Sequence, residues 1–226
     1  SRRKENGTLP VKPVIVSTIV STSLAEKVAA EYGAEFVSVL TGFKYIGGEI
    51  AKLESKGQTE RFVLGYEESY GYLSGSYVRD KDAVVASMLV AEMTAYYLKS
   101  GKTLVDRIEE IYARFGTYEH KLKSYEYPGA EGSAKMNALL SDLRKNLPSE
   151  LGGSKIVRTV DYLTQTELDL PKSNVLSFEA ENGSKLIVRP SGTEPLIKLY
   201  FTAASTPKEN EEIFAKMFAQ TEKIFA

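Results

Sequence analysis

The sequence predicts an α/β layered domain with a mostly parallel sheet, followed by a smaller α+β domain with an antiparallel sheet. Two observations carry this prediction. Strand-like and helix-like segments alternate from residue 13 to about residue 115, as in βαβ units. Four strand-like segments then follow one another between residue 155 and residue 203, ahead of a last helix. We therefore expect the first domain to span residues 1–116 and the second to span residues 117–226.

The composition excludes several classes of function. The chain has 226 residues and a net charge of −1, with no polybasic segment, so we expect neither nucleic acid nor a membrane as a partner. It has no cysteine and one histidine, His120, which argues against thiolate metal sites, Cys nucleophiles and histidine triads. No apolar run is long enough to span a bilayer and no signal peptide is visible, so the predicted location is the cytoplasm. The abrupt, charged start suggests a fragment of a longer protein.

The elements of the first domain are short apolar strands and amphipathic helices. A capping box at Ser23–Glu26 begins one helix, and Thr103 caps another whose inward face ends at Phe115. A further helix, from about residue 82 to residue 98, has Glu92 as its only charge after Ala83. A helix that is apolar on almost every side is expected to be buried. The strands are predicted at residues 13–17, 35–39 and 61–65.

The second domain opens with an extended segment over residues 118–127 and a helix near residues 136–147. Thr206-Pro207 begins the last helix, with proline at the first helical position. The buried face of that helix is predicted to hold Ile213, Phe214, Met217, Phe218 and Ile224. The four strands are predicted at residues 155–163, 174–180, 185–189 and 196–203.

A loop between the last two strands combines groups that bind anions. The stretch from Arg189 to Pro195 holds a guanidinium, two hydroxyls and a glycine, and these groups with backbone N–H donors suit a phosphate dianion. Gly192 lets the backbone approach the anion closely. Strand alternation puts Lys198 on the same polar face as Arg189. An ordinary surface turn with a solvated arginine, and a solvated strand lysine, remain alternatives.

An acidic loop follows a predicted strand of the first domain. Glu67, Glu68 and Ser69 stand between glycines and tyrosines directly after an apolar segment. Ligands of open α/β sheets bind beyond the carboxyl ends of strands, and paired carboxylates with a serine suit adjacent sugar hydroxyls. A solvated acidic turn is the alternative.

Two further polar stretches begin helices. Thr41-Gly42-Phe43-Lys44 follows a strand, and its N–H groups with Lys44 suit an anionic group. Taken alone, this stretch favours an ordinary strand-to-helix turn with Thr41 as the cap. Arg79-Asp80-Lys81-Asp82 precedes the apolar helix. Its carboxylates suit a helix N-terminus, whereas Lys81 must pair with them or serve a ligand. No three carboxylates have metal-ligand spacing, so we predict no metal site.

In this order and spacing the four stretches resemble the C-terminal half of an α-D-phosphohexomutase, of the phosphoglucomutase/phosphomannomutase superfamily, over essentially the whole chain. The resemblance implies a four-domain enzyme that moves phosphate between C1 and C6 of a hexose through a phosphoserine and a bisphosphorylated sugar. The phosphoserine and the Mg²⁺-binding loop belong to the first two domains of that family, and neither motif occurs here. The implied partners are a hexose phosphate and the missing N-terminal domains. The resemblance also implies Mg²⁺ as a cofactor of the complete enzyme and glucose 1,6-bisphosphate as its intermediate or activator. This half alone is expected to be inactive.

The resemblance also implies roles for individual residues. Glu67 and Ser69 match the ligands of sugar hydroxyls O3 and O4. The positions expected to bind the sugar or line the cleft are Thr41, Gly42, Lys44, Glu67, Ser69 and Lys81. The positions expected to bind the phosphate that is not reacting are Arg189, Ser191, Gly192, Thr193 and Lys198. No catalytic residue is assigned to this chain.

The acidic loop distinguishes branches of the superfamily. Its Ser69-Tyr70-Gly71 resembles the Glu-Glu-Ser-aromatic-Gly of phosphoglucomutases, whereas phosphomannomutases and phosphoglucosamine mutases usually have Ser-Gly-His. We therefore expect glucose phosphates as substrates. No histidine stands there for proton transfer, so no general acid or base is assigned. A phosphomannomutase and a non-catalytic sugar-phosphate-binding module remain the alternatives.

Overall fold

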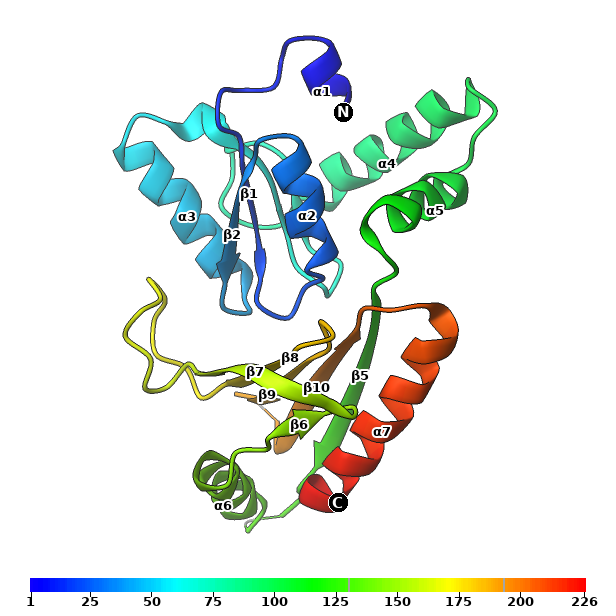
Figure 1. Ribbon diagram of the computed structural model, residues 1–226. Helices are drawn as coiled ribbons and strands as arrows, with labels where there is room; N and C mark the ends of the chain where they lie inside the picture. Colours follow the sequence, from blue (N-terminus) through cyan, green and yellow to red (C-terminus); the bar gives the residue numbers. More distant parts are fainter. Residues whose placement is uncertain (130, 193) are drawn as a thin grey trace. The chain divides into compact units, whose positions relative to one another are not determined.

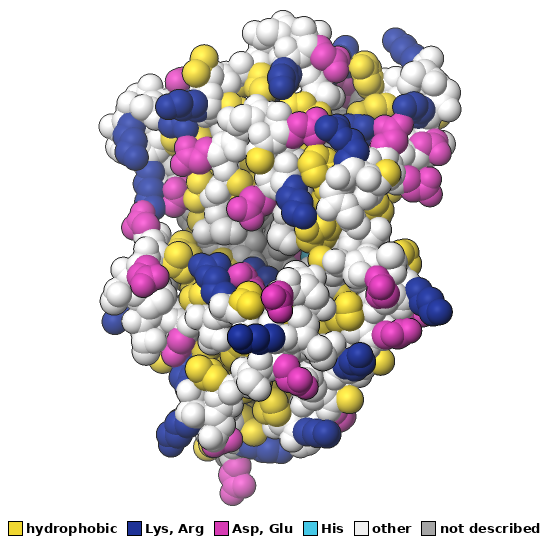
Figure 2. Space-filling model, in the orientation of Figure 1, with side chains coloured by type: hydrophobic (Ala, Val, Ile, Leu, Met, Phe, Trp, Pro, Cys, Tyr) yellow, Lys and Arg dark blue, Asp and Glu magenta, His cyan; other side chains and the backbone are white. Residues whose placement is uncertain are grey.

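The computed structural model describes residues 1–129, 131–192 and 194–226 (Figure 1). The chain folds into two compact units, Ser1–Phe115 and Gly116–Ala226. The first is an α/β unit and the second is built on an antiparallel sheet, which confirms the predicted fold class. On the face seen in Figure 2, basic and acidic side chains are interspersed, as the small net charge leads one to expect.

The first unit is built on a four-stranded sheet with the order β2-β1-β3-β4. The parallel strands are β1 (Val14–Thr18), β2 (Glu35–Val39) and β3 (Phe62–Tyr66), and β4 (Tyr72–Leu73) adds a short antiparallel edge. The helical segments are α1 (Arg2–Glu5), α2 (Leu24–Glu31), α3 (Phe43–Ser55), η1 (Thr59–Arg61), α4 (Ala83–Leu98) and α5 (Leu104–Phe115). Strand ends of this sheet position the loops that the sequence singled out.

Helix α3 covers one face of this sheet closely. Ile46 and Ile50 are fully buried, because α3 packs on β1 and β3. A Cβ on Gly65 would lie 2.5 Å from the Ile46 side chain, so the glycine lets helix and strand approach. Ser23 makes no side-chain cap at the start of α2, so the predicted capping box is wrong. The hydroxyl of Thr22 accepts from the Leu24 amide there instead.

The prediction that the apolar helix is buried is also wrong. Helix α4 contains no buried residue, and Val84 and Met88 are 81% and 59% exposed. Helix α4 packs mainly beside β4, and much of its remaining surface has no neighbour in the described chain. Helix α5 likewise has no buried residue. An apolar composition indicates that a helix needs to be buried, but it does not identify the segment that buries it.

The second unit is built on a six-stranded sheet with the order β5-β10-β9-β8-β7-β6, paired antiparallel throughout. Its strands are β5 (Glu119–Glu126), β6 (Glu150–Leu151), β7 (Ser154–Asp161), β8 (Leu176–Ala180), β9 (Lys185–Pro190) and β10 (Leu196–Ala203). Two helices accompany them, α6 (Gly132–Lys145) and α7 (Pro207–Phe225). The four predicted strands correspond to β7, β8, β9 and β10.

Helix α7 begins as predicted. Thr206 is its N-cap, in a reciprocal capping box with Glu209, and Pro207 opens the helix. Phe214 and Met217 of its buried face enter the core of the unit. Ile224, predicted to face inward, is 37% exposed, and the neighbouring Phe225 is buried in its place.

None of the helices described here has both the length and the hydropathy that crossing a bilayer requires.

Candidate functional site

The acidic loop of the first unit is held in place by α3. Strand β3 leads into Glu67, whose side chain is only 8% exposed. The Glu67 carboxylate oxygen Oε1 accepts a hydrogen bond from the backbone N–H of Gly42 at 3.0 Å. The Glu67 amide donates to the Gly71 carbonyl at 2.8 Å, which closes the loop. Two of the predicted site residues, Gly42 and Glu67, are thus in direct contact.

Gly42, and not Thr41, is the N-cap of α3. Gly42 has a φ of 123°, a conformation that glycine adopts readily and other residues rarely. The expected cap by the Thr41 side chain is therefore wrong, because the backbone turns one residue later. In this conformation the N–H of Gly42 donates its hydrogen bond to the Glu67 carboxylate.

Lys81 lies beside the same carboxylate. A Cβ added to Gly71 would stand 2.5 Å from Lys81 Cδ and 3.1 Å from Glu67 Oε2, so both side chains lie against Gly71. The Lys81 ammonium is 3.0 Å from an Asp80 carboxylate oxygen and 5.2 Å from the centre of the Phe43 ring. Lys81 thus pairs with an aspartate, which is one of the two alternatives that the sequence left open, and its stem lies next to Glu67.

The loop that carries Lys81 is seated on α3 by a glycine that sequence reasoning missed. A Cβ on Gly47 would stand 2.8 Å from the Arg79 carbonyl oxygen, so only glycine allows this approach. Arg79 also pairs with Glu54 of α3 at 2.8 Å. The Gly47-Gly48 pair inside a helical pattern was the available signal, since such glycines mark close backbone approaches.

A second contact missed from the sequence orders the other glutamate. Thr18, at the carboxyl end of β1, is 2% exposed and donates to Glu68 Oε2 at 2.9 Å. The Thr18 and Ser21 hydroxyls are also 2.9 Å apart. The sequence signal for this contact was the group of polar residues at the end of an apolar strand, because ligands of open α/β sheets bind beyond the carboxyl ends of strands.

Two predicted residues of the first unit lie outside this cluster of contacts. Ser69 is exposed on the loop. Lys44 is also exposed, and its ammonium lies 4.9 Å from the centre of the Tyr45 ring. Neither is linked to Glu67 by a hydrogen bond or ion pair in the described part of the chain.

The basic pair of the second unit is confirmed as a geometric feature. The register of β9 and β10 sets Lys198 directly opposite Arg189. Directly opposed residues of an antiparallel pair share one face of the sheet. Both side chains are half-buried, and neither has a carboxylate partner among the residues that the structure describes. Two cations side by side repel each other, so this face favours an anion.

The loop beside the pair is partly organised by its own hydrogen bonds. The Ser191 amide donates to the Leu196 carbonyl at 2.8 Å, and the Glu194 amide donates to the Ser191 hydroxyl at 3.3 Å. Gly192 is exposed, and a Cβ there would meet no atom within 4 Å. The chain's own packing therefore does not require this glycine. Thr193, the remaining predicted residue, lies outside the described residues.

Asp80 and Asp82, near the candidate site, are occupied by hydrogen bonds from within the chain. Asp82 caps α4 by accepting from the amides of Val84 and Val85, and it also accepts from the Tyr77 hydroxyl, which with these amides lowers its pKa. The Lys81 amide and ammonium lower the pKa of Asp80 in the same way. Within the described ranges no three His, Cys, Asp or Glu side chains come together as a metal site.

Comparison with protein families identifies both units. Residues 1–115 match the family described as phosphoglucomutase/phosphomannomutase, alpha/beta/alpha domain III. Residues 135–220 match the phosphoglucomutase/phosphomannomutase C-terminal domain.

Several relatives carry the name phosphoglucomutase. The protein of Staphylococcus haemolyticus is 34% identical over 226 residues, covering 95% of this chain and 40% of its own length. That of Staphylococcus aureus strain USA300 is 39% identical over 197 residues, covering 83% of this chain and 35% of its own length. The chain thus spans well under half of these relatives.

Solved structures share the fold. Parafusin, a phosphoglucomutase from Paramecium solved in an open form, matches with a TM-score of 0.67 and 22% identity, over 92% of this chain and 36% of that one. A putative phosphomannomutase from Thermus thermophilus matches with a TM-score of 0.61 and 19% identity, over 98% of this chain and 38% of that one.

An open α/β unit followed by a curled antiparallel unit, with these matches, defines the C-terminal half of the phosphohexomutase class. The chain belongs to the phosphoglucomutase/phosphomannomutase family, of which it contains domain III and the C-terminal domain.

Proposed function

We propose that this chain supplies the sugar-binding and distal-phosphate-binding loops of a phosphoglucomutase. The complete enzyme would interconvert hexose 1-phosphate and hexose 6-phosphate through a phosphoserine and glucose 1,6-bisphosphate. Glu67 and Ser69 would bind sugar hydroxyls, with Thr41, Gly42, Lys44 and Lys81 around them. Arg189, Ser191, Gly192, Thr193 and Lys198 would bind the phosphate that is not reacting.

The observation that carries this proposal is the strand register that sets Arg189 directly opposite Lys198. Two half-buried cations in register cost free energy in the empty protein, because like charges directly opposite each other destabilise a sheet. A phosphate dianion between them removes that repulsion and adds charge-assisted hydrogen bonds, which a guanidinium donates in fork geometry. A solvated surface turn would gain nothing from this arrangement.

The first unit offers a different chemistry. The Gly42 N–H fixes one oxygen of the Glu67 carboxylate, and the other oxygen lies on the side of Gly71 and Lys81. A carboxylate accepts hydrogen bonds and an ammonium donates them, so together they complement hydroxyl groups, each of which does both. Because Glu67 is nearly buried and already oriented, little side-chain entropy remains to be lost on binding.

This division of labour explains why no catalytic group is assigned here. Asp80 and Asp82 are occupied by backbone amides, Tyr77 and Lys81, and Mg²⁺ and the phosphoserine would belong to other domains of the longer enzyme. Binding the phosphate that stays unreacted supplies remote binding energy, which orients the reacting end of the sugar.

Glucose phosphate is the favoured substrate. The Ser69-Tyr70-Gly71 sequence is of the phosphoglucomutase kind, and the curated relatives named above carry that name.

Calorimetric titration with glucose 1-phosphate tests the proposal. Arg189→Met should weaken binding without lowering the urea unfolding midpoint of the phosphate-free protein. Arg158→Met is the matched control, since Arg158 is also a strand arginine of the second unit but is paired with Glu179. Equal affinity of the wild type and Arg189→Met would refute the assignment.

A further inference from the structure

The backbone of Lys81 is fixed from both sides. On one side the loop is seated on α3, where a Cβ on Gly47 would stand 2.8 Å from the Arg79 carbonyl oxygen. On the other side Asp82 caps α4, and its amide donates to the Tyr72 carbonyl at 2.8 Å. The direction of the Lys81 side chain is therefore decided by the contacts that this side chain makes.

Two carboxylates and one aromatic ring lie around that side chain. The Lys81 ammonium is 3.0 Å from an Asp80 carboxylate oxygen and 5.2 Å from the centre of the Phe43 ring. The stem of Lys81 and the Oε2 atom of Glu67 both lie against Gly71. Yet no ion pair joins Lys81 to Glu67 in the part of the chain that the structure describes.

Of the two carboxylates, that of Glu67 should attract the ammonium more strongly. Glu67 is only 8% exposed, and a charge shielded from water interacts more strongly with a neighbouring charge. The Asp80 side chain is 77% exposed, and exposed ion pairs contribute little. Asp80 alone therefore does not explain the direction of Lys81. The Phe43 ring is the remaining contact, and a ring face attracts a cation that lies within about 6 Å of its centre.

Burial by itself does not require an aromatic residue at position 43. Phe43 begins the buried stripe of α3, which continues through Ile46, Ile50 and Leu53. The other members of this stripe are aliphatic, and an aliphatic side chain could extend it. Only an aromatic side chain also offers a negative face to the ammonium of Lys81.

We propose that Phe43 is a positioning residue of the sugar-binding site, because its ring holds the Lys81 ammonium away from the Glu67 carboxylate. An ammonium paired directly with Glu67 would occupy both groups, and a sugar hydroxyl would have to break that pair in order to bind. With the ammonium over the ring, Glu67 Oε2 is open to accept a hydrogen bond and Lys81 is open to donate one. This inference rests on the proposed binding of sugar hydroxyls by Glu67 and Lys81.

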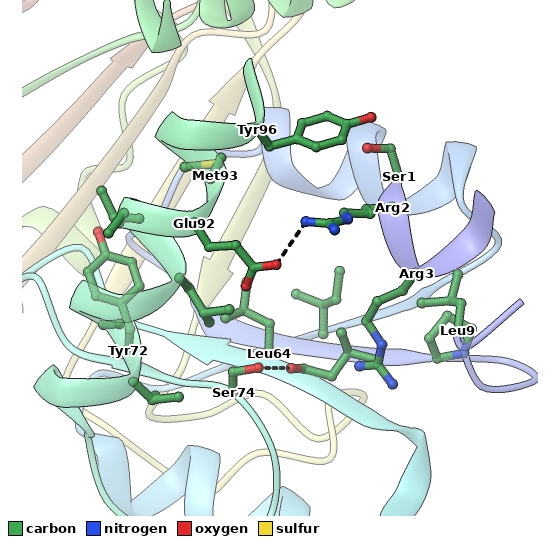
Figure 3. A pocket seen from close by; sticks show the side chains of 18 of the residues that line it. Ser1, Arg2, Arg3, Leu9, Leu64, Tyr72, Ser74, Glu92, Met93 and Tyr96 are labelled. Carbon is green, nitrogen blue, oxygen red and sulfur yellow. Dashed lines mark hydrogen bonds and ion pairs between the residues drawn. The ribbon is translucent and has the colours of Figure 1, made fainter. Parts of the chain in front are cut away.

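The apolar pocket of the first unit is separate from this arrangement. Figure 3 shows the pocket beside α4, with Met93 and Tyr96 among the residues that line it. Phe43, Glu67 and Lys81 do not line it. A molecule or segment in that pocket therefore does not decide where the Lys81 ammonium lies.

Fluorination of the Phe43 ring tests the proposal. Fluorine withdraws electron density from the ring face and changes the size of the ring little, so mono-, di- and trifluorinated phenylalanine weaken the attraction stepwise. Calorimetry of the protein with glucose 1-phosphate measures the affinity at each step. We expect a stepwise loss that reaches roughly two- to fivefold with the trifluorinated ring. The affinity for inorganic phosphate should stay unchanged, because the loop proposed to bind it belongs to the second unit.

The matched control is the same fluorinated series at Phe62. Phe62 is buried in the same unit, and no cation lies over its ring among the described residues. Its fluorination should leave the affinity for glucose 1-phosphate unchanged. An equal loss at both positions would mean that fluorine acts through packing, and the proposal would be overturned.

Lys81→Met separates this inference from the proposed function. If Lys81→Met weakens the binding of glucose 1-phosphate but every fluorinated Phe43 protein binds like the wild type, Phe43 is only a core residue. The proposed role of Lys81 would then stand. If Lys81→Met binds like the wild type, Lys81 lies outside the sugar site, and both the inference and that role are overturned. Equal weakening of glucose 1-phosphate and inorganic phosphate by fluorination at Phe43 would mean a change in the whole protein, which also overturns the inference.

Discussion

Replacing Lys198 by methionine should have opposite effects on the empty and the phosphate-bound protein. Methionine keeps the length and the apolar packing of the lysine stem but removes the charge opposite Arg189. Without phosphate, the loss of like-charge repulsion between directly opposed residues should stabilise the second unit by roughly 0.2–1 kcal/mol.

With phosphate the sign reverses. A hydrogen bond to a charged group contributes about 1.5–3 kcal/mol, so Lys198→Met should bind phosphate roughly tenfold to hundredfold more weakly. Ligand binding stabilises the folded state by RT ln(1 + [L]/Kd), so at high phosphate the wild type gains more stability than the variant. The wild type should thus be the less stable protein without phosphate and the more stable one with it.

Urea unfolding with and without inorganic phosphate measures the stability change in the empty and in the phosphate-bound protein. Tyrosine fluorescence can follow the unfolding, because the chain has no tryptophan. Lys155→Met is the matched control, since Lys155 is an exposed strand lysine of the same unit, opposite Glu150. The control should show no reversal. If Lys198→Met is less stable than the wild type under both conditions, the lysine is structural and the reasoning is refuted.

Three further predictions concern single positions. Gly47→Ala should destabilise the first unit by about 1–3 kcal/mol, because the new Cβ meets the Arg79 carbonyl oxygen. Gly48→Ala places its Cβ in open space and should stabilise the helix by up to about 1 kcal/mol. Urea unfolding of each variant measures these opposite changes in stability. Gly192→Ala should leave unfolding unchanged, since nothing lies within 4 Å, yet weaken phosphate binding by calorimetry; unchanged affinity would show that no ligand approaches this glycine. Burial opposes ionisation of Asp161, but hydrogen bonds from Arg144 and the Leu163 amide prevail and lower its pKa below the usual 3.8. The stability that this group contributes is therefore present above pH 3.8 and is lost as the pH falls through the lowered pKa. Asp161→Asn should be less stable than the wild type at neutral pH, and the difference in unfolding free energy should narrow in acid. A difference that stays constant with pH would contradict this prediction.

Much of the fold was predictable because its signals are local. Alternation along β9 and β10 placed Arg189 and Lys198 on one face, and the register sets them opposite each other. The Thr206-Pro207 pair identified the start of α7, because capping depends on a few adjacent residues.

The features that escaped prediction depend on partners distant in sequence. The Gly42 N–H bonds a carboxylate 25 residues away, and nothing in the helix start itself indicates this. Gly47 is required by a carbonyl from the Arg79 loop, although the glycine pair hinted at a close approach. The exposure of α4 was missed because apolar periodicity indicates that a helix needs burial and does not say which segment provides it.

The central claim is that one loop recognises sugar hydroxyls and the other recognises phosphate, and amide chemical shifts test it most directly. Inorganic phosphate should shift the amides of Arg189 and Ser191 and leave those of Gly42 and Glu67 unmoved. Glucose 1-phosphate should shift all four. Saturable binding of glucose 1-phosphate that leaves Arg189 and Ser191 unmoved, or shifts confined to other parts of the chain, would contradict the account.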